Sequence, residues 1–178
     1  MRRAVYSAAV MPHRICWVEL VGRGAIGMAP CPRGGAWLAY AINDWSNAGV
    51  TAIVSLLSES EVGQLDMWHE ADLCVQHGIR FIAFPIPDRQ VPEHNAVLKL
   101  LDELAQLLRG GRRVVIHCRL GIGRSSLVLA SLLVKSGVPA ERAFARIAAA
   151  RGCDVPDTDE QREWVCEFER KIRPPAGK

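Results

Sequence analysis

Several features are scarce or absent in this 178-residue chain, and each absence excludes a class of protein. No uninterrupted apolar run approaches the roughly 20 residues of a membrane-spanning helix, so we expect no membrane partner. The six cysteines show no zinc-ligand spacing, which argues against a structural metal site. A formal net charge of only +3 does not call for a nucleic-acid partner. Repeats and low-complexity segments are also absent.

The remaining composition is that of a globular protein. Hydrophobic residues make up 49% of the chain, and its length suits one domain with a proper core. We predict a single domain over residues 1–173, a loose tail over 174–178, and a monomer. The apolar stretch after Arg2 and Arg3 is short and interrupted, so we expect no secretory signal.

Strand-like and helix-like segments alternate along the chain. The strand patterns cover residues 15–21, 51–57, 79–84 and 113–117. The helix patterns cover residues 36–48, 58–76, 92–109, 125–136, 140–150 and 158–172. Such alternation predicts an α/β fold with a mainly parallel central sheet flanked by helices, and a site at the carboxyl ends of the strands.

The most informative segment is residues 117–125, His-Cys-Arg-Leu-Gly-Ile-Gly-Arg-Ser, between a predicted strand and a predicted helix. Backbone N–H groups of this turn and of the helix start would converge on one point and favour an anion there. The same field favours a thiolate at Cys118, which is therefore the candidate nucleophile. The planar guanidinium of Arg124 can grip two phosphoryl oxygens at once. The residues expected to bind phosphate are Arg119, Leu120, Gly121, Ile122, Gly123 and Arg124.

Two other motifs compete with this loop and fail on context. Cys74 and Arg80 repeat the spacing of Cys118 and Arg124, but their flanks predict a helix end rather than an anion site. Residues 22–27 match the glycine pattern of dinucleotide-binding proteins, but Pro30 and Pro32 prevent the long helix that such a site needs.

Residues 117–125 resemble the active-site loop of the cysteine-dependent protein tyrosine phosphatases. The chain is most similar to their small dual-specificity group, near its kinase-associated and cell-division-cycle-14-like members, over about residues 17–168. The resemblance implies a tyrosine-phosphatase-like fold, a phosphocysteine intermediate, and neither cofactor nor metal. It also implies a general acid on a separate loop, about thirty residues before the nucleophile.

Asp88 fits that expectation, since it lies 30 positions before Cys118 on the proline-rich segment 84–92. A carboxylic acid held there could protonate the leaving oxygen of a phosphate ester. Asp88 could instead simply cap a turn before Pro92. With the phosphate loop downstream, the catalytic interpretation is preferred.

Three further roles follow from the resemblance. His117 would orient the loop, and Ser125 would donate a hydrogen bond to the sulfur when the thiolate leaves. Gln161 would position the water that hydrolyses the phosphocysteine. The spacing of Thr158 and Gln161 is equally explained by a helix capping box, and both interpretations stay open.

We therefore predict a phosphomonoesterase that acts on phosphoproteins, on phosphotyrosine first and on phosphoserine or phosphothreonine as a further possibility. Three alternatives remain: a catalytically silent phosphate-binding docking module, a phosphoinositide phosphatase, and a thiol redox protein with Cys74 or Cys153 as resolving cysteine. Because an essential free thiol favours a reducing compartment, we expect a cytoplasmic protein.

Overall fold

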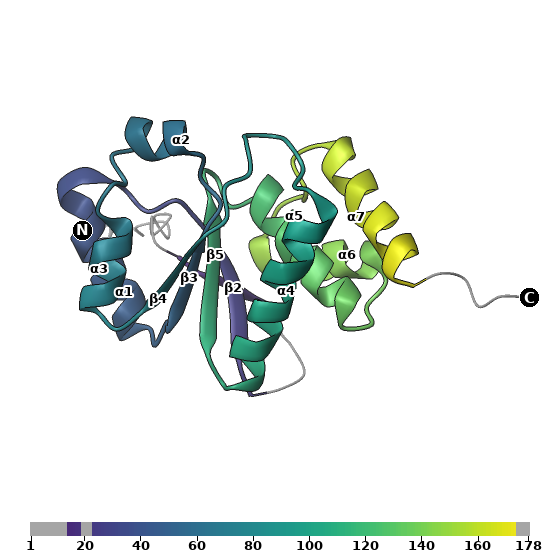
Figure 1. Ribbon diagram of the computed structural model, residues 1–178, viewed down its shortest axis with the longest axis horizontal. Coiled ribbons are helices and arrows are strands. Elements are labelled where there is room, and N and C mark those ends of the chain that lie inside the picture. Colours follow the sequence, from purple (N-terminus) through teal and green to yellow (C-terminus); the bar gives the residue numbers. More distant parts are fainter. Residues whose placement is uncertain (1–13, 19–22, 174–178) are drawn as a thin grey trace, which may run out of the picture.

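The computed structural model describes residues 14–18 and 23–173, which form a five-stranded sheet between two layers of helices (Figure 1). The strands are β1 (Cys16–Val18), β2 (Ala25–Pro30), β3 (Ala52–Ser55), β4 (Arg80–Ala83) and β5 (Arg113–Cys118). The helices are η1 (Gly35–Trp37), α1 (Leu38–Asn47), α2 (Glu59–Gln64), α3 (Glu70–Gln76), α4 (His94–Arg109), α5 (Gly123–Lys135), α6 (Ala140–Arg151) and α7 (Asp159–Ile172). No helix in these ranges is both long enough and apolar enough to cross a bilayer.

The sheet has the strand order β1-β2-β5-β3-β4. Strands β2, β5, β3 and β4 run parallel to one another, and only the edge strand β1 is antiparallel. The predicted α/β fold with a mainly parallel sheet is therefore confirmed. β5 lies at the centre of this sheet, so its carboxyl end is flanked by both neighbouring strands, with Cys118 opposite Pro30 of β2 and His117 opposite Ser55 of β3.

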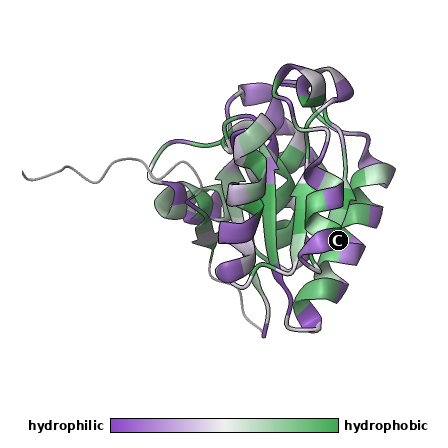
Figure 2. Cartoon of the chain, turned by 90° about the vertical axis from the view of Figure 1, so that its left-hand side faces the viewer, coloured by the Kyte–Doolittle hydropathy of each residue, from purple (hydrophilic) through white to green (hydrophobic). Residues whose placement is uncertain are grey.

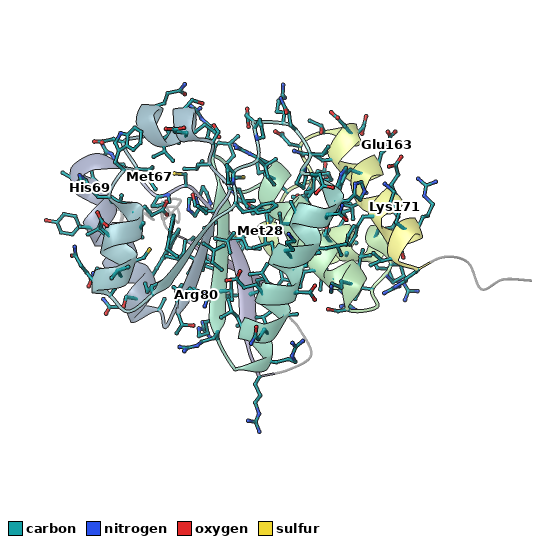
Figure 3. All side chains as sticks on the ribbon, in the orientation of Figure 1. Met28, Met67, His69, Arg80, Glu163 and Lys171 are labelled. Carbon is teal, nitrogen blue, oxygen red and sulfur yellow. The ribbon has the colours of Figure 1, made fainter. Side chains whose placement is uncertain are left out.

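Each face of the sheet has its own hydrophobic core. Helices α1 and α3 cover one face, while α4, α5, α6 and α7 lie on the other (Figure 1). Alternate residues of β5 point to opposite faces: Val114 and Ile116 join the core beneath α4 to α7, and Val115 joins the core beneath α1. The strands are mostly apolar because both faces are buried, and the hydrophilic residues gather on the outer helices (Figure 2).

Helix α5 is the most deeply buried of the described helices. Twelve of its residues are buried, and it packs against α4, α6 and α7. The loop that follows β5 leads directly into α5. Because β5 and α5 are both buried, this loop is anchored at both ends. The predicted phosphate loop is therefore held between two buried elements of the fold.

Two predictions about secondary structure were wrong. The strand β2 was not predicted, because its short sequence contains Gly27 and Pro30, which have low strand propensity. The helix predicted over residues 58–76 is two helices, α2 and α3. Asp66 has a left-handed φ of 52°, which a helix cannot contain, and the buried Met67 turns the chain into the core.

Other boundaries differ by a few residues. Helix α4 begins at His94, where the Glu93 side chain accepts a hydrogen bond from the Ala96 N–H, rather than at Pro92. Helix α5 begins at Gly123 instead of Ser125. The predicted strand over 15–21 is observed as Cys16–Val18, and residues 19–22 lie outside the described ranges. The tail predicted at 174–178 and the proposed domain start lie outside them too.

Candidate active site

Cys118 is the last residue of β5 and opens the loop that leads into α5. It is 3% exposed, and it lies at the carboxyl edge of the sheet, where the sequence predicts the site. Residues 118–124 are called the phosphate loop below.

The close turn of the phosphate loop depends on two glycines. Gly121 has a φ of +63°, and a Cβ atom there would lie 2.4 Å from the Ala29 carbonyl oxygen. A Cβ atom on Gly123 would lie 2.8 Å from both the Asp157 Cβ and the Gln161 side-chain oxygen. Glycine is thus required at the first position by backbone conformation and contact, and at the second by contact alone.

Arg151, the last residue of α6, holds the outside of the phosphate loop. Its Nε donates to the Gly121 carbonyl over 3.0 Å, and its Nη2 donates to the Leu120 carbonyl over 3.1 Å. Because these carbonyls are bound on the outer side, the peptide N–H groups of the same turn are free to face inward. Arg151 therefore stabilises the anion-binding conformation of the loop.

Arg124, in the first turn of α5, is 2% exposed and is held by a buried carboxylate. Its Nη1 and Nη2 donate to the two carboxylate oxygens of Glu61 over 2.6 and 2.8 Å. Nη1 also donates to the Ile86 carbonyl over 2.9 Å. The Nε–H donates to no described residue, so the edge of the guanidinium that carries Nε is available to a substrate.

The bidentate pair changes the titration of both groups. Burial alone would raise the pKa of Glu61, but hydrogen bonds from Arg124 and from the Ser58 backbone outweigh it and lower the pKa to about 2. Burial opposes the charge of Arg124 as well, but the hydrogen bonds to Glu61 and the nearby Cys118 and Asp88 raise its pKa. Both groups are therefore charged at neutral pH.

Asp88 lies on the loop after β4, and its Oδ1 accepts a hydrogen bond from Arg124 Nη2 over 3.0 Å. Its side chain is 59% exposed. The preceding Ile86 is fully buried and anchors this loop in the core. The structure thus brings the predicted acid and the predicted phosphate-binding arginine together, as the spacing suggested.

Gln161 points into the site from the first turn of α7. Thr158 caps this helix by accepting a hydrogen bond from the Gln161 N–H over 3.2 Å. The Gln161 side chain does not return the bond; its Nε2 donates to the Gln90 carbonyl over 3.3 Å. The reciprocal capping box is therefore absent, and the buried Oε1 has no partner among the described residues.

His117 and Ser125 lie on either side of the phosphate loop and are fully buried. His117 Nε2 lies 2.8 Å from the buried carboxylate of Glu70 in α3, a close contact whose angle does not meet that of a hydrogen bond. Ser125 Oγ makes no hydrogen bond with any described residue. The predicted donation from Ser125 to the sulfur is therefore not formed here, and its role stays a prediction.

These groups surround one cavity of about 330 Å³. It is lined by Asp88, Arg89, Cys118, Arg119, Leu120, Gly123, Arg124, Asp157 and Gln161. The predicted nucleophile and arginine of the phosphate loop, the acid of the loop after β4 and the glutamine of α7 thus face one space. Gly121, Ile122 and Ser125 do not line it and instead shape or support the loop.

Two observations bear on other sites. A cavity of about 290 Å³ lies near the amino-terminal ends of β2 and β5, the opposite edge of the sheet, and contains none of the predicted site residues. Within residues 14–18 and 23–173, no group of three or more His, Cys, Asp or Glu side chains has a metal-binding arrangement. Cys74 is buried in α3, and Arg80 pairs with Glu103. These two residues, which have the same spacing as Cys118 and Arg124, therefore form no anion site.

Comparison with known proteins agrees with this arrangement. Residues 27–138, more than half of the chain, match the family described as polymorphic toxin system, DSP-PTPase phosphatase. The chain belongs to this DSP-PTPase phosphatase family. The predicted relation to the small dual-specificity group of tyrosine phosphatases is confirmed.

Individual relatives are moderately similar to this chain in sequence. Cyclin-dependent kinase inhibitor 3 of Rattus norvegicus is 29% identical over 128 residues, which are 71% of this chain but only 60% of that protein. A crystal structure of kinase-associated phosphatase, with its catalytic-site cysteine replaced by serine, superposes with a TM-score of 0.85 at 24% identity, covering 94% of this chain and all of that one. Tk-PTP in its active form has a TM-score of 0.71 at 26% identity, covering 88% and 98% of the two chains.

Three residues of this DSP-PTPase site were missed by the sequence reasoning: Glu61, Glu70 and Arg151. Glu61 forms a capping box with Ser58 at the start of α2 and also binds Arg124, and its place near a helix start does not indicate the second contact. Glu70 and Arg151 lie on separate helices with ordinary helical surroundings. None of the three carries a distinctive local signal, because charged side chains are common in helices and do not by themselves identify a partner.

Proposed function

We propose that this DSP-PTPase family member hydrolyses phosphate monoesters of phosphoproteins, with phosphotyrosine as the first substrate and phosphoserine or phosphothreonine as further ones. The observation that carries the proposal is that Cys118, Asp88 and the buried Arg124 line one cavity. A thiol, a carboxylic acid and a fixed guanidinium are the groups that a two-step phosphoryl transfer through cysteine needs.

In the first step, Cys118 Sγ, as thiolate, attacks phosphorus in line with the leaving oxygen. The sulfur–phosphorus bond forms while the ester oxygen–phosphorus bond breaks, and Asp88 gives its proton to the departing hydroxyl. Backbone N–H groups of the phosphate loop and the Arg124 guanidinium stabilise the charge on the three equatorial oxygens. The product is the free hydroxyl and a phosphocysteine.

In the second step, water attacks the phosphocysteine. Asp88, now ionised, takes the proton from this water, the sulfur–phosphorus bond breaks, and inorganic phosphate leaves with the thiolate restored. Gln161 lines the same cavity and its buried Oε1 has no partner among the described residues, which supports a role in accepting a hydrogen bond from that water. Ser125 would assist by donating to the leaving sulfur.

The proposal is tested by phosphate release from para-nitrophenyl phosphate and from matched phosphotyrosine, phosphoserine and phosphoinositide substrates. We expect Cys118→Ser to abolish turnover and Asp88→Ala to lower kcat by about 10² to 10⁴. A folded, reduced wild type that binds phosphopeptide without turnover would instead identify a docking module. Exclusive turnover of phosphoinositide would establish the lipid alternative.

We also propose that the protein works in a reducing compartment such as the cytoplasm. All six cysteines are free thiols, and the mechanism needs one of them reduced. The monomeric state and the lack of nucleic-acid and membrane partners stay predictions from composition.

A further inference from the structure

A second cavity, of about 420 Å³, lies directly beside the catalytic one. It is formed by the loop after β2, residues 31–35, by residues 64–66 at the end of α2, and by Arg119. Arg119 lines both cavities, so the two cavities are neighbours. We call this second space the flanking subsite.

The charge of the flanking subsite favours an anion. The side chains of Arg33 and Arg119 form no ion pair or hydrogen bond with any described residue, although nearly every other charged group of the active site is paired. Asp66 is the only carboxylate in the lining. Cys31 adds no negative charge, because burial, with nearby Glu70 and Cys118, raises its pKa to about 12. The ionisable lining therefore carries two positive charges and one negative charge.

The outer rim of the subsite suits a polypeptide. The Arg33 guanidinium lies 5.0 Å from the centre of the Trp37 ring, which holds it in place by a cation–π contact. Trp37 and the neighbouring Tyr40 are 53% and 67% exposed, and their ring centres are 6.0 Å apart. Exposed aromatic side chains beside an arginine are typical of the centres of protein interfaces.

We propose that the flanking subsite binds an anionic side chain of the substrate polypeptide, close in sequence to the phosphorylated residue. This inference rests on the proposed function and narrows its substrate class to phosphopeptides with an acidic or phosphorylated neighbour. The Cys31 N–H donates to the Arg119 carbonyl over 3.2 Å, so the loop that carries Arg33 lies against the phosphate loop. Because an extended peptide advances about 3.3 Å per residue, the anionic neighbour is expected within a few positions of the phosphorylated residue. The guanidinium groups of Arg33 and Arg119 then bind the anionic side chain, and a peptide with neutral neighbours lacks this interaction.

The test compares three phosphotyrosine peptides that share one backbone: one with neutral flanks, one with glutamate on both sides, and one with phosphoserine on both sides. We expect wild-type kcat/KM to be about fivefold higher for the anionic flanks than for the neutral one. Arg33→Glu should abolish or reverse this preference, and Arg33→Ala should reduce it. Turnover of para-nitrophenyl phosphate, which has no flank, should be unchanged in both variants.

The matched control is Arg142→Glu, an exposed arginine of α6 that forms no ion pair with any residue the structure describes. It makes the same change in net charge away from the site and should keep the preference. An equal loss in Arg142→Glu, or no wild-type preference at all, would overturn the proposal. A preference for glutamate or for phosphoserine alone would support it and identify the anion that the subsite takes.

Binding separates this inference from the proposed function. In a Cys118→Ser background, fluorescence anisotropy measures peptide affinity without turnover, and the same Arg33-dependent preference is expected. Absence of turnover by wild type with that preference intact would reject the phosphatase proposal and keep the subsite. Turnover by wild type with equal binding of all three peptides would keep the phosphatase proposal and reject the subsite.

Discussion

The buried pair of Glu61 and Arg124 makes a quantitative prediction about stability. Glu61→Gln leaves a neutral amide against a guanidinium that is 2% exposed, where it is held by hydrogen bonds of 2.6 and 2.8 Å. The fall in the pKa of Glu61, from an ordinary value near 4.5 to about 2, corresponds to about 3 kcal/mol in favour of the folded state at pH 7. Breaking buried pairs in other proteins costs a similar 3 to 5 kcal/mol.

The pH dependence has a definite sign. Because the pKa of Glu61 is lower in the folded than in the unfolded state, its stabilisation is fully present above about pH 4.5 and is lost as the pH falls toward 2. The stability difference between wild type and Glu61→Gln should therefore shrink to less than half between pH 7 and pH 3.

Urea unfolding followed by tryptophan fluorescence measures both effects. The matched control is Glu59→Gln, an exposed acidic residue in the first turn of the same helix, which should change stability by less than about 0.5 kcal/mol. If Glu61→Gln were no less stable than this control at pH 7, or if its deficit were constant with pH, the assignment of the pair as a stabilising anchor would be refuted.

Three further predictions concern the phosphate loop and its surroundings. Arg151→Ala should lower kcat/KM at least about tenfold, because the loop loses two carbonyl contacts, whereas Arg142→Ala should leave steady-state kinetics unchanged. Gly121→Ala should eliminate turnover and lower the unfolding midpoint far more than Gly78→Ala, which has the same left-handed φ but open space around it. Gln161→Ala should slow the second chemical step, so that phosphoenzyme accumulates in a rapid-quench burst; an unchanged burst would remove Gln161 from the mechanism.

The sequence predicted the sheet and its site because those signals are local. Apolar β-branched runs are typical of buried parallel strands, and β3 and β5 were found where such runs occur. β2 lacks that signal, since Gly27 and Pro30 interrupt it, and its place in the sheet depends on pairing with β5. The break between α2 and α3 was missed for a related reason. Asp66 follows α2 in the left-handed conformation, which aspartate can adopt but which its presence in a sequence does not predict.

Residues 117–125 alone were enough to predict a nucleophile, a phosphate loop and its arginine, because an anion site of this kind is built from consecutive backbone N–H groups in one turn. The groups that hold this loop in shape could be found only in the tertiary structure. Glu61 lies 63 positions from Arg124, and Arg151 lies 30 positions from Gly121. Such contacts exist because the fold brings Glu61 of α2 to Arg124 and Arg151 of α6 to the carbonyls of Leu120 and Gly121. No periodicity or short motif in the sequence indicates which distant side chains will meet in this way.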